Sequence, residues 1–476
     1  MTAPAAGAAA VGMRVAVVGA GVSGLAAAHR LLRAGAEVAV LEQADRCGGK
    51  VRGARLDGVD LDTGAESVLL RGRPRVAELL QELGLGPALV TPTRAAPAIL
   101  VEGRPVAVPR SLLGVPADLE SLRPLLSEDG WRRAAAEPGL PAPPRDTDLA
   151  VGELVAERFG PEVTTRLLEP LLGGVYAGRS RELSTAAVNP RLWELVRAGG
   201  SLLEGAAASL PATPGGSPFT GVVGGVHQVV EAFAAELGDR LRLSTTVRGL
   251  QQGPDGWVVE TAGADGGRGR HRVDAVVVAT PAAPASRLLA GTAVEPLLAA
   301  VRYASPAVLA LHVSGVEPEG SGLLVPPGEL PTVKAVTHAG RKWDWLGRRT
   351  AEEWGSGHHL VRVSLGRLGE EHLLQRPDQE LVAAALAELA TLPGWGGLRL
   401  HGALVQRWGG GLPQYEVGHL DRVEQVERAV AGLPGLELCG AAYRGVGVGP
   451  CLESGLAAAD RVLATAAAVV QSPRAR

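Results

Sequence analysis

Three glycines near the start of the chain have the spacing of a phosphate-binding turn. Gly19, Gly21 and Gly24 lie between a β-branched run ending at Val18 and a stretch with helical periodicity. Gly19 permits a tight turn, Gly21 leaves the backbone open to a pyrophosphate, and Gly24 lets the helix pack close to the strand. Free N–H groups at a helix N-terminus favour anions. The segment therefore predicts dinucleotide binding.

An acidic residue follows this turn at a distance that suits nucleotide recognition. After the predicted helix, which Gly35 should terminate, AEVAVLE is typical of a second buried strand and ends at Glu42. A carboxylate about 20 residues beyond the turn can accept hydrogen bonds from an adenosine ribose, and it repels the 2′-phosphate of NADP. A glycine turn alone is weak evidence, because many helices follow such turns. Strand, helix, strand and acid in this order favour nucleotide binding.

The composition indicates a soluble globular protein. The chain has 476 residues, 46% hydrophobic and 20% charged, so it can form two or three domains with separate cores. A net charge of -3 argues against nucleic acid as a partner. Cys47, Cys439 and Cys451 are odd in number and lack zinc-like spacing, which argues against disulfides and a metal site and favours the cytoplasm. No apolar run is long enough to span a bilayer, and the N-terminus does not resemble a cleavable signal; peripheral membrane contact is left open.

Hydrophobic periodicity predicts further elements along the chain. A hairpin is expected in VRGARLDGVDLD, followed by a helix over residues 75–83. Residues 112–210 have a mainly helical pattern with proline-rich loops. The chain should end with a strand, a glycine-rich loop and a helix that returns to the first unit. Other strands are expected over residues 241–252, 273–281, 307–313 and 360–365.

Longer motifs carry a resemblance to a known family. ADRCGGKVRG is similar to the (D/S)RxGG segment of a flavoprotein superfamily that includes amine oxidases, carotenoid desaturases and protoporphyrinogen oxidases. Most of the chain resembles the flavin-dependent porphyrinogen oxidases of the soluble bacterial branch. Two departures are Gly449 in GVGVGPC and Lys334, which stands in a strand expected to be uncharged. The matching segments are LEQADRCGGKVR, DTGAESVLLRGRP, EPLLGGVYAGRSRELS, GGVHQVVEAF, VVVATP, QRWGGGLPQYEVGHLDRV and CGAAYRGVGVGPCLESG.

The resemblance implies an α/β fold with three parts. A Rossmann-like FAD-binding domain should be discontinuous and should be accompanied by a mixed-sheet substrate domain and an inserted helical subdomain. The C-terminal helix should return to the first part of the FAD-binding domain. The expected ranges are 12–85, 216–297 and 406–470 for the FAD-binding domain, 86–111 and 298–405 for the substrate domain, and 112–215 for the helical subdomain.

The same resemblance implies noncovalent FAD and a set of cofactor-binding residues. Val247 also suits an ordinary core strand, and Trp408 also suits a packing role. The glycine loop has a stronger claim, because backbone N–H groups that approach a flavin require small residues. The expected contacts are Gly19, Ala20, Gly21, Val22, Ser23 and Gly24 with phosphate; Glu42 and Gln43 with ribose; Lys50, Gly64, Ala65, Glu66 and Ser67 with the second phosphate region; Val247 with adenine; and Trp408, Gly447, Val448 and Gly449 with the isoalloxazine.

The family's substrate is a tetrapyrrole with propionate arms, oxidised by six electrons in two-electron steps during haem biosynthesis. Coproporphyrinogen III is the expected substrate, with molecular oxygen as acceptor. The flavin N5 carries the chemistry, so we expect no catalytic side chain and no metal. Arginine binds carboxylates well. Candidate substrate contacts are Arg71, Arg73 and Arg179, each of which could equally form a surface ion pair. Tyr176 and Tyr443 could flank the ring, but a core role with a bonded hydroxyl is favoured for both.

Several other functions are compatible with the same motifs. Protoporphyrinogen IX is an alternative substrate. An amine oxidase could use Lys334 near flavin N5, but only 3% of residues are aromatic and YRGVGV lacks the second ring of an amine cage. RSRELS and LPQYEVGH argue against a carotenoid desaturase. A noncatalytic porphyrin-binding partner is a further alternative, and the oligomeric state does not follow from the sequence.

Overall fold

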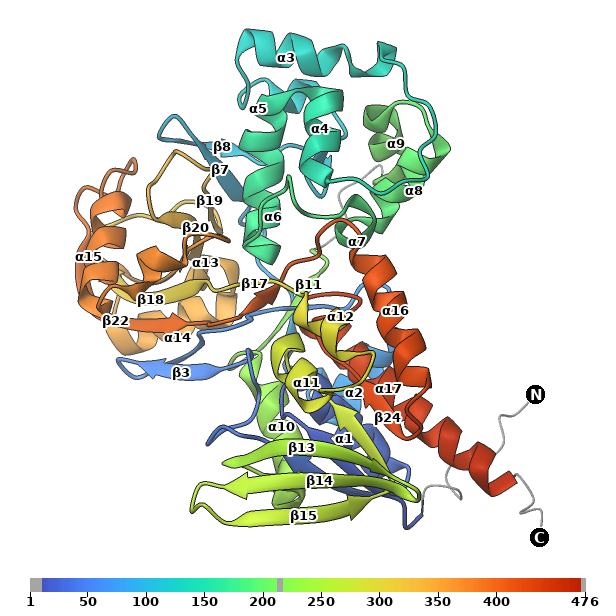
Figure 1. Cartoon of the computed structure of the whole chain (residues 1–476). Coiled ribbons are helices and arrows are strands. Elements are labelled where there is room, and N and C mark those ends of the chain that lie inside the picture. Colours follow the sequence, from blue (N-terminus) through green and yellow to red (C-terminus); the bar gives the residue numbers. More distant parts are fainter. Residues whose placement is uncertain (1–10, 212–216, 472–476) are drawn as a thin grey trace.

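The computed structural model describes residues 11–211 and 217–471. A five-stranded parallel sheet forms the core of its Rossmann-like part (Figure 1). The strands are apolar because both faces of the sheet are covered. They come from distant segments, so this domain is discontinuous, as expected. In spatial order they are β12 (Leu241–Arg242), β2 (Glu37–Leu41), β1 (Arg14–Val18), β16 (Ala275–Val278) and β24 (Leu436–Leu438).

Helices cover one face of this sheet. α1 (Val22–Arg33) packs between β1 and the C-terminal helix α17 (Val448–Gln471), which returns to the first unit as expected. The two helices approach closely because glycine stands at their contact: a Cβ on Gly455 would lie 2.0 Å from the carbonyl oxygen of Ser23. The same core includes α10 (His227–Leu237) and α2 (Pro74–Glu82).

A second, antiparallel sheet covers the opposite face. It consists of β13 (Thr245–Gly253), β14 (Gly256–Gly263) and β15 (Arg268–Val273). Trp257 and Val259 belong to the same buried core as Ala16 and Val18 of β1. The alternate side chains of β1 belong to the core that contains α1. α11 (Ala282–Leu288), α12 (Glu295–Ala299) and α16 (His419–Ala431) complete this side.

Two strand predictions in this region need correction. The single strand expected over residues 241–252 is two strands, because Ser244 adopts φ +50° and turns the chain from the parallel sheet into the antiparallel one. The strand expected over residues 273–281 begins only at Ala275, since Val273 ends β15. Apolar periodicity was similar on both sides of each break, so it gave no sign of a change of sheet.

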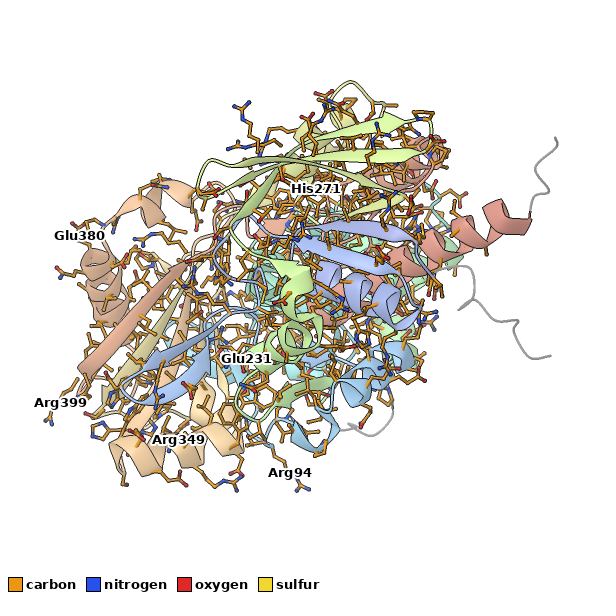
Figure 2. The ribbon with its side chains drawn as sticks, turned by 90° about the horizontal axis from the view of Figure 1, so that it is seen from below. Arg94, Glu231, His271, Arg349, Glu380 and Arg399 are labelled. Carbon is orange, nitrogen blue, oxygen red and sulfur yellow. The ribbon has the colours of Figure 1, made fainter. Side chains whose placement is uncertain are left out.

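A seven-stranded mixed sheet lies beside the Rossmann-like part. α15 (Asp378–Leu389) packs on one face, and α13 (Ala339–Lys342), α14 (Asp344–Trp354) and the hairpin β3 (Gly53–Leu56) and β4 (Val59–Asp62) pack on the other. Figure 2 shows Arg349, Glu380 and Arg399 at the outer edge of this part. In order the strands are β22 (Arg399–Arg407), β18 (Ala307–Ser314), β21 (His358–Leu365), β20 (Val333–His338), β19 (Gly322–Leu324), β7 (Pro97–Val101) and β8 (Arg104–Ala107).

The segment with a helical pattern forms a separate body at one end of the molecule (Figure 1). A buried ion pair between Glu137 and Arg158 joins its helices, and Glu137 also accepts hydrogen bonds from Ser201 and Leu202. α6 reaches from this body toward the other two parts. The helices are α3 (Glu128–Ala135), α4 (Val151–Phe159), α5 (Pro161–Val163), α6 (Glu169–Tyr176), α7 (Thr185–Val188), α8 (Pro190–Ala198) and α9 (Leu202–Ser209).

Short elements connect these parts. The strands are β5 (Val68–Leu69), β6 (Leu89–Val90), β9 (Ser111–Leu112), β10 (Val115–Pro116), β11 (Phe219–Val222), β17 (Tyr303–Ala304) and β23 (Leu412–Pro413), with β11 between β5 and β6 and β17 beside β23. Turns of 3₁₀ helix are η1 (Gly86–Ala88), η2 (Glu120–Leu122), η3 (Glu137–Gly139), η5 (Gly238–Arg240) and η6 (Glu371–Gln375), and η4 (Thr164–Leu168) is a π turn.

Some expectations concern parts of the chain that the structure does not describe. The expected boundary between residues 215 and 216 lies outside the described residues, as do the first ten residues of the N-terminal segment. Within residues 11–211 and 217–471, no helix is long and apolar enough to cross a bilayer.

The close contact between α1 and α17 predicts a specific loss of stability. A methyl group in Gly455→Ala would clash with backbone rather than with a movable side chain, so the free energy of unfolding should fall by about 1–3 kcal/mol. Gly396→Ala is the matched control, because a Cβ there meets no atom within 4 Å. Denaturant unfolding of both variants measures the difference, and equal stability of the two would contradict the proposed contact.

Candidate functional site

The glycine turn leaves an open approach to the N-terminus of α1. Gly21 is the N-cap and offers no side-chain cap, so the N–H groups of the first turn have no intrahelical acceptor. A Cβ on Gly21 would meet nothing within 4 Å, whereas one on Gly24 would lie 2.0 Å from the carbonyl oxygen of Gly19. Gly19 itself has φ +101°. The turn is therefore closed toward the protein and open where a pyrophosphate would lie, which fits a dinucleotide.

Glu42 stands next to this turn at the end of β2. Its carboxylate accepts hydrogen bonds from the backbone N–H groups of Ala20 (2.7 Å) and Ala44 (2.9 Å), which hold it in place while leaving further lone pairs for a ribose. The N–H of Thr245 donates to the Glu42 carbonyl oxygen at 2.7 Å. This bond brings half-buried Val247 to the same end of the site, whereas Gln43 is exposed.

Lys50, Gly64 and Trp408 meet although they are far apart in the sequence. The N–H of Ala65 donates to the Lys50 carbonyl oxygen at 3.2 Å, and a Cβ on Gly64 would lie 1.9 Å from that oxygen. The Trp408 indole N–H donates to Thr63 at 3.2 Å. Burial lowers the pKa of Lys50, whose ammonium lies 5.8 Å from the Tyr303 ring centroid. Trp408 therefore covers the segment that was expected to contact the second phosphate region.

Glu66 links this segment to the seven-stranded sheet. Its carboxylate pairs with Lys342 at 2.6 Å and with Arg362, and Arg362 also donates to the Gly64 carbonyl oxygen at 2.6 Å. Burial would raise the pKa of Glu66, but the two cations outweigh that effect and hold it at about 2. Glu66 is thus engaged by protein cations, while half-buried Ser67 follows it.

The glycine-rich loop before α17 is held by Tyr415. The Tyr415 hydroxyl donates to the Ala441 carbonyl oxygen and accepts from the Gly445 N–H, both at 2.7 Å. Gly447 has φ +95° and its Cβ direction is open except for Pro450 at 4.0 Å. A Cβ on Gly449 would instead lie 2.5 Å from the Leu69 carbonyl oxygen, which explains the unexpected glycine there. Val448 points into the core beside α1.

The residues expected to contact substrate lie around two different segments. Arg73 pairs with Glu453 near the glycine-rich loop, and Arg71 is exposed. Arg179 donates to the Leu368 carbonyl oxygen at 3.2 Å and pairs with Glu370. Both Arg73 and Arg179 therefore form the ion pairs that were considered as an alternative to substrate binding.

The two tyrosines are both buried. The Tyr176 ring lies 5.6 Å from the Tyr415 ring, and burial raises the pKa of Tyr176 to about 12. Tyr443 is buried and its hydroxyl has no hydrogen-bond partner among the residues that the structure describes, contrary to the expectation for a core tyrosine. Tyr176 is therefore close to the residue that holds the glycine-rich loop.

Sequence reasoning missed several residues that organise the site. Arg362 and Lys342 were not singled out, although Arg362 is a charge inside the apolar strand LVRVSL and such a residue calls for a buried partner. Tyr415 stands in a matching motif, but its two hydrogen bonds depend on a loop 26 to 30 residues away. The pairing of distant charges could be found only in three dimensions.

Comparison with known proteins agrees with this arrangement. Residues 22–463 match the family of flavin-containing amine oxidoreductases. The chain belongs to this family. Membership confirms the predicted flavoprotein fold and a flavin cofactor. The resemblance to porphyrinogen oxidases is confirmed by curated relatives of that name.

Three relatives and two solved structures illustrate the similarity. Coproporphyrinogen III oxidase of Mycobacterium leprae is 36% identical (92% of this chain, 95% of the relative), and that of Bacillus subtilis is 28% identical (94% and 97%). Protoporphyrinogen oxidase of Macaca fascicularis is 30% identical (96% and 92%). A crystal structure from Exiguobacterium sp. 255-15, assigned as a protoporphyrinogen oxidase, has TM-score 0.82 and 28% identity (95% and 99%). Putrescine oxidase bound to putrescine has TM-score 0.69 and 18% identity (95% and 99%), a likeness of fold alone.

The Glu66 network predicts a pH-dependent effect on stability. Glu66→Gln leaves Arg362 and Lys342 without their carboxylate, so unfolding should become easier by about 3–5 kcal/mol at neutral pH. The pKa of Glu66 is lowered from 4.5 to about 2, so its contribution is present above about pH 4.5 and is lost as the pH falls toward 2. The difference between wild type and variant should therefore shrink over that range in denaturant titrations.

Exposed Glu352→Gln on α14 is the control and should change stability little at any pH. A difference between Glu66→Gln and wild type that stays constant from neutral pH to about pH 2 would contradict the role of the Glu66 carboxylate.

Proposed function

We propose that this protein oxidises coproporphyrinogen III to coproporphyrin III in haem biosynthesis, using FAD and molecular oxygen. The observation that carries the proposal is the 36% identity, over nearly the whole of both chains, with an enzyme named coproporphyrinogen III oxidase. A reducing cytoplasm is the proposed location, and the three cysteines are unpaired. The conversion removes six electrons in three two-electron steps.

FAD is the proposed flavin because the site has a place for an adenosine half. The N–H groups of Val22, Ser23 and Gly24 would bind the pyrophosphate, and Glu42 the ribose. Lys50 would add positive charge beside the phosphates, and Trp408 and the loop over 447–449 would border the isoalloxazine. When bound, FAD supplies hydride acceptance at N5 and transfer of electrons to oxygen. Binding is proposed to be noncovalent.

The chain's own residues would orient the substrate and exclude water. Buried Tyr176 and Tyr415 pack beside the glycine-rich loop and would hold it in position. Arg71, Arg73 and Arg179 are proposed to bind propionates, and a propionate would have to compete with Glu453 at Arg73 and with Glu370 at Arg179. The division into FAD-binding, substrate and helical parts over the expected ranges is proposed on the same basis.

The substrate proposal predicts a rate preference. The FAD-loaded protein should oxidise coproporphyrinogen III faster than protoporphyrinogen IX in air, measured by porphyrin fluorescence after subtraction of autoxidation. Faster oxidation of protoporphyrinogen IX would support the alternative named for the macaque relative. Oxidation of neither, with FAD bound, would contradict porphyrinogen oxidation, and amines would then be tested as substrates.

The FAD proposal predicts opposite effects of two glycine substitutions. Gly21→Ala should leave the apoprotein stable, because its Cβ meets no protein atom, yet weaken FAD binding about tenfold or more by displacing the pyrophosphate. Gly24→Ala should destabilise the apoprotein, because its Cβ would overlap the Gly19 carbonyl. Reconstitution followed by flavin fluorescence measures the FAD affinity, and denaturant unfolding measures the stability of the apoprotein. Gly139→Ala is the control in both experiments. Wild-type FAD affinity in Gly21→Ala would argue against the pyrophosphate position.

A further inference from the structure

Lys334 is a buried lysine whose ammonium has no close acceptor. It stands on β20 and is 6% exposed, and its ammonium forms no hydrogen bond or ion pair in the described part of the chain. A buried ammonium without an acceptor is unfavourable, so such a residue is rarely retained for packing alone. Burial and nearby Arg367 outweigh the opposing charge of Glu370 and lower the pKa of Lys334 to about 7. The residue is therefore suited to an anion that the protein itself does not supply.

The position of Lys334 in the sheet places it at the cofactor side. Leu365 of β21 pairs with Ala307 of β18 on one side and with Val333 of β20 on the other. β18 begins immediately after Pro306, whose carbonyl oxygen accepts a hydrogen bond from the backbone N–H of Trp408 at 2.8 Å. Adjacent strands are about 4.8 Å apart, so the start of β20 lies about 10 Å from the start of β18. Lys334 thus belongs to the sheet end that adjoins Trp408.

Two arginines accompany Lys334 along a path to the surface. Arg367 donates to the Val325 carbonyl oxygen at 2.8 Å, and the Val325 N–H donates to the Lys334 carbonyl oxygen at 3.0 Å. Glu370 pairs with both Arg179 and Arg367. The exposed fraction of the side chain falls from 43% at Arg179 to 7% at Arg367. An anion entering beside Arg179 would meet increasingly buried positive charge.

The charges of this group do not cancel. Glu370 and Glu169 are the acids that act on Arg367, and Glu169 already accepts hydrogen bonds from the backbone N–H and the hydroxyl of Ser180. Three cations, Lys334, Arg179 and Arg367, therefore face two carboxylates. Glu370 acts on Lys334 as well, but it is shared with Arg179 and Arg367, so the group keeps one excess positive charge and the Lys334 ammonium has no close carboxylate of its own among the described residues.

The end of α6 separates this group from the glycine-rich loop. The Leu368 N–H donates to the Ala177 carbonyl oxygen at 2.7 Å, which ties the cationic segment to the helix end. Tyr176, one residue earlier, packs on Tyr415, whose hydroxyl holds Gly445. Two buried aromatic rings thus lie between the glycine-rich loop and the cations. The cations are therefore held at a fixed place relative to that loop, where the carboxylate arm of a substrate beside the loop could reach them.

We propose that the Lys334 ammonium binds one propionate carboxylate of the tetrapyrrole, with Arg367 and Arg179 providing the positive path to it. The inference rests on the proposed function, since it names a recognition element of that same substrate site. Carboxylate binding favours the charged form of Lys334. Because free Lys334 has a pKa of about 7, binding at pH 8 should take up a proton, and affinity should fall as the pH rises above 7.

Binding of the product porphyrin tests the proposal directly. The FAD-loaded protein is titrated with coproporphyrin III and with its uncharged tetramethyl ester, followed by porphyrin absorbance. Lys334→Met should raise the Kd of the acid about tenfold or more and leave that of the ester unchanged, whereas Lys334→Arg should retain binding of the acid. Arg348→Met, on exposed α14, is the control and should resemble wild type. The KM for coproporphyrinogen III should rise in Lys334→Met with little change in kcat.

The outcomes separate this inference from the proposed function. If the wild type oxidises no porphyrinogen, the proposed function fails. If the wild type is active but Lys334→Met binds acid and ester as the wild type does, the inference fails. Should Lys334→Met lose FAD, calorimetry at pH 8 in buffers of different ionisation enthalpy decides: the wild type should take up a proton with coproporphyrin III and Lys334→Arg should not. Equal proton uptake by the two proteins would overturn the inference.

Discussion

The close approach of α1 to β1 and to α17 is the constraint on which the cofactor site depends. Gly19 and Gly24 let the helix begin directly at the strand end, and Gly455 lets the last helix pack on the first. A side chain at Gly24 or Gly455 would push these backbones apart, and the N–H groups of α1 would then no longer point at the position of the pyrophosphate. Steric contact therefore sets the geometry on which phosphate binding relies.

Electrostatics connects the two halves of the site. Glu66 follows the segment beside Lys50, whereas its partners belong to the seven-stranded sheet and the helix that follows it: Arg362 lies on β21 and Lys342 on α13. Any one of these charges would be costly alone at this depth, so each requires the others. The network therefore connects the segment beside Lys50 to the seven-stranded sheet.

The region around α6 combines buried aromatic side chains with a group of cations. Tyr176 and Tyr415 are the aromatic residues, and the cations are Lys334, Arg179 and Arg367. A flavin carries the oxidation chemistry itself, so correct placement of a large tetrapyrrole ring matters more than an acid or base supplied by the protein. In the proposed reaction, recognition of the ring and of its carboxylates would thus be the main task of this chain's side chains.

The sequence by itself determined the first strand–helix–strand unit, the flavoprotein family and the helical insertion. Glycine spacing, the position of Glu42 and long motifs can all be read within short segments of the chain. The conformation of the glycine turn follows from steric contacts within such a segment. Only the tertiary structure decided that residues 241–252 divide between two sheets, that Gly449 packs against Leu69, and that Glu66 meets Arg362. It also decided that the Lys334 ammonium has no hydrogen-bond or ion-pair partner among the residues that the structure describes. These facts depend on contacts between residues far apart in the chain, and periodicity carries no information on which distant charge or carbonyl a buried residue will meet.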